Sequence, residues 1–304
     1  MSTTRLLIER LRQDLISADP LPPPPSLPNI PLAPSRIFPR TPETESLYAR
    51  EARHHTTALL GIGHVGTRYA TEVVLQFQAE LAVAHAAVDT LLPDDWAEKN
   101  GLLPLRSRVT AHREFLLRPD LGRRLDEPSL RRLEAEADKE IDVQPILADG
   151  LSAVACMKSG LLLLESFTAA CKRRGLRVGT PVCARFARVW LEDEIGQTTR
   201  ARVAAILLGE RPGLGTGDGL SAYLVYEPRV GKTDGDRNMM SNIHARGLPP
   251  ELAGDRLAVL AKAMIDQRTS GVTLDLSRLS AELGEAASRA PRQPQPRTRL
   301  VEVP

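Results

Sequence analysis

The feature that most constrains the fold is an alternation of short apolar runs with helical stretches in the second half of the chain. Apolar and β-branched residues predict strands at residues 143–147, 182–190, 203–208 and 220–226. Apolar residues spaced three and four positions apart predict helices at 150–172 and 249–267. Gly271 is expected to stop the second helix. Because strands that alternate with helices favour parallel pairing, we expect an α/β fold with a Rossmann-like, partly parallel sheet and flanking helices.

The first 43 residues predict a short amphipathic helix on a stiff tether. In residues 1–17, Leu7, Leu11 and Leu15 recur every four positions, with charged residues on the other side. Residues 18–43 hold ten of the 24 prolines, and proline favours an extended polyproline conformation. We expect the helix to dock onto a partner, and the alternative is that it packs back onto its own domain.

The remaining sequence divides into three regions. Apolar residues at helical spacing predict a long helix at 67–91, so residues 44–138 are interpreted as a helical region. The alternating strands and helices then define an α/β domain at 139–278. Residues 279–304 are rich in proline, arginine and glutamine and are predicted to form a disordered tail.

Composition excludes several classes of function. The 40 Lys and Arg residues nearly balance the 38 Asp and Glu residues, and only 4% of residues are aromatic, which argues against nucleic-acid binding. No apolar run approaches the roughly 20 residues that span a membrane. The three cysteines lack the C-x-x-C spacing of a metal site and indicate a reducing compartment. We therefore expect a cytoplasmic protein that binds neither nucleic acid, membrane nor metal.

A glycine pattern raises the alternative of a nicotinamide-binding dehydrogenase. Gly61, Gly63 and Gly66 form G-x-G-x-x-G, which in a βαβ unit places a pyrophosphate at a helix N-terminus. That unit also needs a buried strand before the glycines and an acidic residue about 20 positions later, at the end of a second strand. The position of that acidic residue lies inside the predicted helix at 67–91. The pattern therefore favours a glycine-rich helix entry over a dinucleotide site.

Polar residues follow three of the predicted strands, where ligands bind in open α/β sheets. Asp149 and Ser152 follow the first strand, and either could cap the next helix. Residues 185–189 end the second strand with two arginines and an apolar wall, and Glu210 and Arg211 follow the third. Together these groups predict a ligand crevice. Because the sequence has no H-E-x-x-H, G-x-S-x-G or Walker lysine, it predicts no self-contained catalytic residues.

An extended series of motifs resembles one enzyme family. The longest is GERPGLGTGDGLSAYLVYEPRVGKTDGDRNMMSNIHARGLPP at residues 209–250. It is accompanied, in order along the chain, by RPDLGRRL at 118–125, DVQPILADGLSA at 142–153, ARVWLEDEIG at 187–196 and SGVTL at 270–274. These motifs cover most of residues 58–275 and resemble the small (light) subunit of adenosylcobalamin-dependent ethanolamine ammonia-lyase.

The resemblance implies a chain that works only with a partner. In this family the light subunit packs against a large TIM-barrel subunit that binds ethanolamine, and adenosylcobalamin lies between the two chains. The barrel and the cofactor carry out the radical deamination to acetaldehyde and ammonia, so no catalytic residue is expected here. Carried over by motif, the cofactor-binding positions are Val189, Glu210 and Met239, with Arg188 as a neighbour.

The sequence departs from the family pattern at three places. Met239 stands where the family usually has cysteine, and Gly-His-Val-Gly at residues 63–66 stands where it has Gly-Arg-Ala-Gly. The family also has an Asp-His pair near the position of Glu80 and Leu81. A noncatalytic scaffold descended from the lyase is therefore an alternative to the lyase subunit. Because some relatives are cargo of bacterial microcompartments, the helix at 1–17 also resembles a peptide that targets a protein shell.

Overall fold

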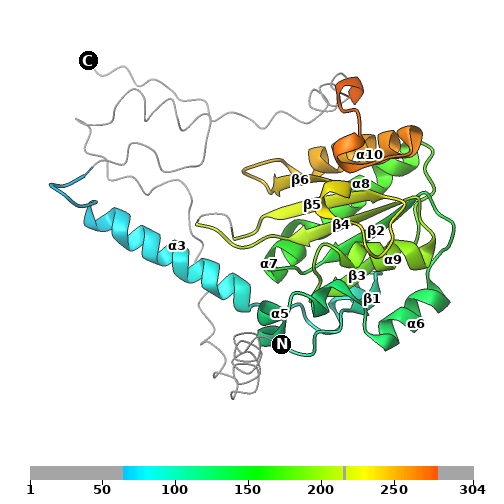
Figure 1. Cartoon of the computed structure of the whole chain (residues 1–304). Helices are drawn as coiled ribbons and strands as arrows, with labels where there is room; N and C mark the ends of the chain where they lie inside the picture. The colour runs from blue at the N-terminus through cyan, green and yellow to red at the C-terminus, as the bar shows by residue number, and fades with distance from the viewer. Residues whose placement is uncertain (1–63, 215–216, 280–304) are drawn as a thin grey trace, which may run out of the picture.

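A computed structural model describes residues 64–214 and 217–279, which form a mixed α/β fold around a six-stranded sheet (Figure 1). The strands are β1 (Leu103–Arg106), β2 (Val143–Ala148), β3 (Val182–Arg185), β4 (Val203–Gly209), β5 (Leu220–Tyr226) and β6 (Arg237–Ile243). Their order across the sheet is β1-β3-β2-β4-β5-β6. The first four strands pair in parallel, and β5 and β6 add antiparallel neighbours. The predicted α/β fold with a partly parallel sheet is confirmed.

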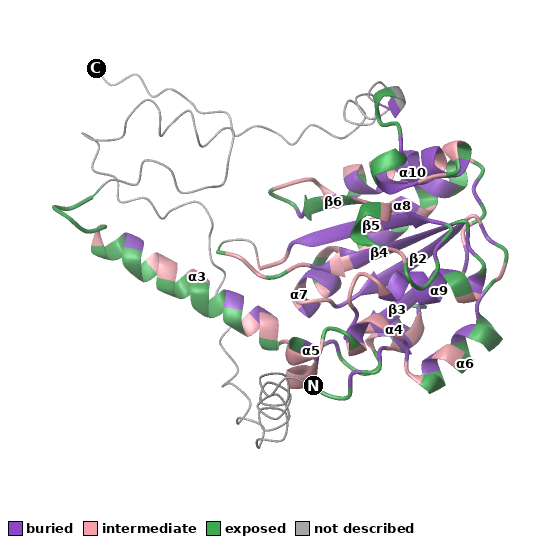
Figure 2. Ribbon diagram, viewed as in Figure 1, coloured by how far each residue is buried: buried purple, intermediate pink, exposed green. Residues whose placement is uncertain are grey.

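Helices cover both faces of the sheet. The helical elements of the described residues are α3 (Thr71–Asp89), α4 (Trp96–Lys99), α5 (His112–Leu117), α6 (Glu127–Glu136), α7 (Ala153–Ala155), a π-helical turn (Cys156–Gly160), α8 (Leu161–Arg173), α9 (Leu191–Thr199) and α10 (Pro250–Gln267). The helices α8 and α10 pack on one face, and α6 and α9 pack on the other. Buried residues accordingly fill the sheet and the inner sides of these helices, while α3 is largely exposed (Figure 2).

Alternation along the strands explains the two-sided core. On β4, Val203, Ala205 and Leu207 point to the face covered by α8 and α10, whereas Ala204 and Ile206 point to the face covered by α6 and α9. Successive side chains of a strand face opposite ways, so a strand buried on both faces must be apolar throughout. This explains why the strand could be recognised from its continuous apolar run.

The predicted strands and helices agree with the structure except at some boundaries. The strand predicted at 182–190 ends at Arg185, because Phe186 adopts a left-handed conformation with φ of 54°. The helix predicted at 249–267 ends at Gln267 as expected, but Arg268, with φ of 54°, takes the left-handed capping position in place of Gly271. Both corrections concern how an element ends.

The strands β1 and β6 were not predicted. The four-residue strand β1 lies inside residues 44–138, which the sequence analysis interpreted as helical, and it pairs with β3 at the edge of the sheet. The helix predicted at 67–91 is α3, and Gly66, in a turn with φ of 64°, precedes it. The amphipathic helix at 1–17, the linker at 18–43, Gly61, Gly63 and the tail beyond residue 279 lie outside the described residues.

Among the residues that the structure describes, one helical stretch is long and apolar enough to cross a membrane. Ala153–Arg173, which joins α7, the π-helical turn and α8, has a mean hydropathy of 1.4 over 18 residues. Length and composition are weak evidence, because core helices of soluble proteins meet the same criteria. In this fold the stretch packs against α10 and the sheet, and Leu163 and Phe167 are fully buried.

Candidate functional site

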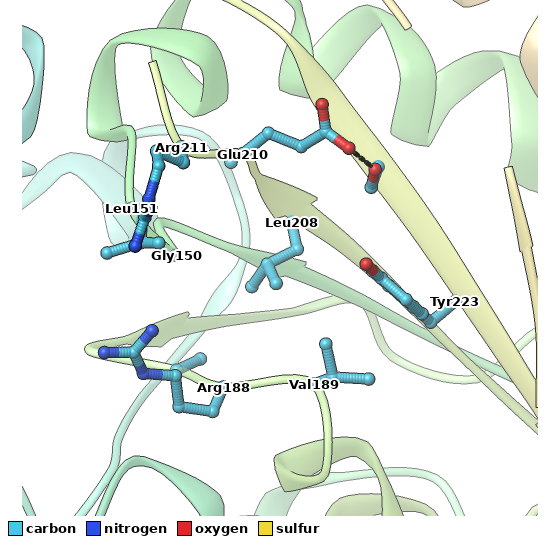
Figure 3. A pocket seen from close by; sticks show the side chains of 11 residues that line it. Gly150, Leu151, Arg188, Val189, Leu208, Glu210, Arg211 and Tyr223 are labelled. Atoms are coloured by element: carbon cyan, nitrogen blue, oxygen red, sulfur yellow. Dashed lines mark hydrogen bonds between the residues drawn. The ribbon is translucent and has the colours of Figure 1, made fainter. Parts of the chain in front are cut away.

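A cleft of about 370 Å³ opens at the carboxyl ends of β2, β3 and β4 (Figure 3). This is the edge of an open α/β sheet at which ligands bind. The lining residues are Gly150, Leu151, Ala187, Arg188, Val189, Leu208, Gly209, Glu210, Arg211, Ser221 and Tyr223. The structure thus brings together the three strand exits that the sequence analysis singled out, and it adds two side chains of the antiparallel strand β5.

Two glycines let the backbones behind the cleft approach closely. A Cβ atom at Gly150 would lie 2.3 Å from the carbonyl oxygen of Gly209, and Gly150 also has a φ of 54°. A Cβ atom at Gly209 would lie 2.2 Å from the carbonyl oxygen of Ser152. Both distances are too short for any side chain, so the exits of β2 and β4 can meet only through glycine. The backbone N–H of Leu151 donates to the Gly209 carbonyl at 2.9 Å and fixes this contact.

Asp149 binds the backbone of the residues that follow β3 and does not cap a helix. Its buried carboxylate accepts hydrogen bonds from the backbone N–H groups of Phe186 at 2.9 Å and Ala187 at 3.3 Å. Burial raises the pKa of Asp149 to about 6, although these hydrogen bonds and Arg185 act in the opposite direction. The helix cap is Ser152, whose hydroxyl accepts from the backbone N–H of Ala155 at 3.1 Å. Asp149 therefore sets the path of the chain into the cleft.

Arg188 and Val189 form one wall of the cleft. The backbone N–H of Arg188 donates to the carbonyl of Gly122 at 2.8 Å, and its guanidinium donates to the carbonyl of Phe115 at 2.7 Å. The guanidinium also lies 4.1 Å from the centre of the Phe115 ring. Its Nε atom is buried and has no hydrogen-bond partner among the described residues. Val189 is half-buried beside it and packs on the core under α9.

Glu210 belongs to the opposite side of the cleft. Its backbone N–H donates to the carbonyl of Gly219 at 3.0 Å, and the Ser221 hydroxyl donates to its carboxylate. Burial, with a contribution from the Glu210 charge, raises the pKa of Tyr223. Figure 3 shows Glu210 and Tyr223 on this side and Arg188 on the other. Ser221 and Tyr223 were not predicted as lining residues, although their alternation with apolar residues along 220–226 places them on one face of the strand.

Met239 lies beside the cleft and does not line it. It is directly opposite Tyr223 in the pairing of β5 with β6, so the two side chains share one face of the sheet. The Met239 side chain is 54% exposed. Of the four expected cofactor positions, the structure therefore brings Arg188, Val189 and Glu210 into the cleft and puts Met239 at its outer margin.

The cleft presents hydrogen-bond donors on one side and acceptors on the other. Guanidinium groups line one side, a carboxylate and hydroxyl groups line the other, and Leu151, Val189 and Leu208 supply apolar surface between them. Among the described residues, no group of three His, Cys, Asp or Glu side chains could hold a metal ion. The arrangement suits a large ligand with amide or charged groups on an apolar frame.

A comparison with protein families agrees with the sequence motifs. A family model described as ethanolamine ammonia-lyase light chain (EutC) matches residues 48–275. This match covers most of the chain, including all six strands and the cleft. The glycine pattern at 61–66 falls inside the same match, and the acidic position required for a ribose contact falls within α3. A dinucleotide-binding unit at these glycines is therefore not supported.

Proposed function

Because this chain belongs to the ethanolamine ammonia-lyase light-chain family, we propose that its cleft holds one edge of adenosylcobalamin where the light chain meets the large subunit. When bound, adenosylcobalamin would supply the radical chemistry that converts ethanolamine, held by the large subunit, to acetaldehyde and ammonia. This chain's residues bind and orient the cofactor edge and keep water from it.

The lining of the cleft is the observation that carries this proposal. A corrin ring has an apolar face and a rim of amide side chains, which need both hydrogen-bond donors and acceptors. The cleft supplies donors from Arg188, acceptors from Glu210, and apolar contact from Val189 and Leu208. These residues fit the chemistry of the ring edge.

The size of the cleft supports a cofactor shared with a second chain. Pockets that enclose a drug-sized ligand have volumes of roughly 300–1,000 Å³. Adenosylcobalamin is several times larger than a drug-sized molecule, and the cleft of about 370 Å³ can enclose only part of it. The remaining surface of the cofactor would be covered by the large subunit.

Glu210 and Val189 have separate roles in this proposal. Ser221 holds one carboxylate oxygen of Glu210, which leaves the other oxygen free to accept from an amide N–H of the ring edge. Val189 contributes apolar contact. It lies two residues before the start of α9 at Leu191, so the position of its backbone follows that of the helix. Met239 adds an exposed and adaptable apolar side chain at the margin of the cleft, where a bound ring could extend.

The test is a titration of the assembled lyase. The chain is co-expressed with its large subunit, and the purified complex is titrated with adenosylcobalamin by absorbance. We expect Glu210→Ala to weaken binding about tenfold or more, because a hydrogen bond to a charged group is lost. Glu165→Ala is the matched control, since Glu165 is exposed on α8, away from the cleft. The complex is also assayed for acetaldehyde release.

Two results would contradict the proposal. Equal affinity in Glu210→Ala and in wild type would remove the cleft as the cofactor site. A stable complex of the two wild-type chains that binds no adenosylcobalamin would support the alternative of a noncatalytic scaffold descended from the lyase.

We also propose a location for the complex. The predicted amphipathic helix at 1–17 and its proline-rich tether are suited to docking on a protein surface at a distance from the folded domain. The proposal is that the lyase is a cytoplasmic enzyme that this helix directs into a bacterial microcompartment.

A further inference from the structure

Three guanidinium groups gather at one side of the cleft. Arg188 and Arg211 line it, and in Figure 3 both side chains lie at the end of the cleft away from Tyr223 and from the carboxylate of Glu210. Arg123 lies nearby, with its guanidinium 4.3 Å from the centre of the Trp190 ring. The charges are close enough that Arg123 and Arg211 both contribute to a lowered pKa of Arg188, after the larger effect of its burial.

The three arginines are short of negative partners. Within the described residues, no carboxylate lies within ion-pair distance of Arg123, Arg188 or Arg211. Asp149 attracts Arg188, but this effect on the pKa of Arg188 is smaller than the opposing effects of Arg123 and Arg211, and the Asp149 carboxylate is bound to the backbone N–H groups of Phe186 and Ala187. Glu210 adjoins Arg211 in sequence, but its carboxylate points across the cleft to Ser221.

Such an arrangement is unfavourable without an anion. Like charges repel, and partial burial of Arg188 removes water that would screen them. Arg188 is held in place by the carbonyl and ring of Phe115, and Arg123 by the ring of Trp190, so these side chains cannot simply turn away. An anionic group entering this side of the cleft would be met by preformed donors.

We infer that this arginine cluster, formed by Arg123, Arg188 and Arg211, binds the phosphodiester of the nucleotide tail of adenosylcobalamin. The inference rests on the proposed function and deepens it, because it assigns the two sides of the cleft to different parts of one ligand. The corrin rim carries neutral amides, whereas the tail carries the one phosphodiester charge. Guanidinium groups bind phosphate oxygens in pairs of parallel hydrogen bonds, which a neutral amide cannot match.

The experiment compares corrinoids that differ in the tail. The complex of both subunits is titrated by absorbance with adenosylcobalamin, with adenosylcobinamide, which lacks the phosphate and nucleotide, and with adenosylcobinamide phosphate. We expect Arg211→Gln to weaken adenosylcobalamin and adenosylcobinamide phosphate about tenfold and to leave adenosylcobinamide within about twofold of wild type. Arg229→Gln is the matched control, because Arg229 is exposed in the turn after β5, at the opposite end of the sheet.

Salt provides a second measurement. Wild-type affinity for the two phosphate-bearing corrinoids should fall more steeply with ionic strength than affinity for adenosylcobinamide, and Arg211→Gln should reduce that difference. This readout does not depend on catalysis.

The outcomes separate this inference from the proposed function. If Arg211→Gln weakens all three corrinoids equally, or none of them, the arginine cluster does not bind the phosphate. If the substitution instead disrupts assembly of the two chains, seen by size-exclusion chromatography, the cluster binds the large subunit and the inference is overturned. If wild type binds none of the corrinoids, the proposed function itself fails.

Discussion

At the scale of single residues, Asp149 shows how a buried carboxylate can shape the cleft without lining it. Two successive backbone N–H groups, from Phe186 and Ala187, donate to its two oxygens. The next two residues, Arg188 and Val189, then enter the cleft. In asparagine one of these oxygens is replaced by an NH2 group, which donates and cannot accept, so one of the two N–H groups would face another donor. The carboxylate is therefore retained despite the free-energy penalty of its burial.

Asp149 should give stability an unusual dependence on pH. Its pKa rises from 3.8 to about 6 on folding, so the folded state binds more protons than the unfolded state between these values. Its contribution to stability is therefore fully present below about pH 4 and is lost as pH rises through 6. We expect the unfolding free energy of wild type minus that of Asp149→Asn to fall by up to about 3 kcal/mol between pH 4 and 7. Urea denaturation at each pH measures the unfolding free energies of wild type and of Asp149→Asn. If the difference between them does not change with pH, the prediction is contradicted.

The cleft residues that follow parallel strands could be predicted from the sequence, whereas those on the antiparallel strand β5 could not. Val189 and Glu210 could be predicted, because a general rule places ligands at the carboxyl ends of parallel strands. Ser221 lies on β5, and its role depends on antiparallel pairing that puts it opposite Leu208. Met239 was reached only through the family resemblance, since its position depends on pairing with Tyr223. Pairing of this kind is a property of the folded sheet.

At the scale of elements, a buried charge cluster ties β6 to α9. The guanidinium of Arg237 on β6 donates to Glu192 at 2.7 Å and to Asp193 at 2.9 Å, both in the first turn of α9. All three side chains are almost fully buried, and burial raises the pKa of Glu192 well above its ordinary value. Because Val189 lies just before α9 and Met239 just after Arg237, this cluster sets the distance between two expected cofactor positions.

Removing the cation from this cluster should strongly destabilise the protein. We expect Arg237→Met to lower the unfolding free energy by about 3–5 kcal/mol, because two buried carboxylates lose their partner. Adding Glu192→Gln and Asp193→Asn should recover part of the loss, since the uncompensated charge is then removed. The exposed control Arg229→Met should stay within about 0.5 kcal/mol of wild type. Urea denaturation measures the unfolding free energy of each variant. A loss of unfolding free energy in Arg237→Met no larger than in the control would show that the cluster is not stabilising.

The two strands that were not predicted, β1 and β6, lie at the edges of the sheet. The strand β1 has only four residues, and β6 carries polar and exposed residues at several positions. Neither has the continuous apolar run that revealed β4, because an edge strand is buried less and its side chains need not be apolar. The strand β3 was predicted too long for a different reason. Its apolar pattern continues past Arg185, but Asp149 captures the next N–H groups and turns the chain.

At the scale of the whole molecule, the described fold offers one side of a site. The cleft lies at the carboxyl edge of the sheet, and the sheet itself is covered by helices on both faces. The described residues bury a large apolar cluster on each face of the sheet, whereas the cleft is too small to enclose the cofactor that we propose for it. This division matches a subunit that folds around its own core and shares its ligand with a partner.

The predicted helix at residues 1–17 should affect location without affecting binding. It is joined to the folded domain by a tether of 26 residues, 18–43, so its loss should leave the cleft and the subunit interface intact. We expect deletion of residues 1–17 to abolish co-sedimentation of the lyase with microcompartment shells in a host that makes them, while affinity for adenosylcobalamin stays within about twofold. Deletion of residues 288–304, of equal length, is the control and should keep co-sedimentation. Shells that still carry the shortened lyase would show that another surface directs it there, and loss of cofactor affinity would show that the helix packs on the lyase itself.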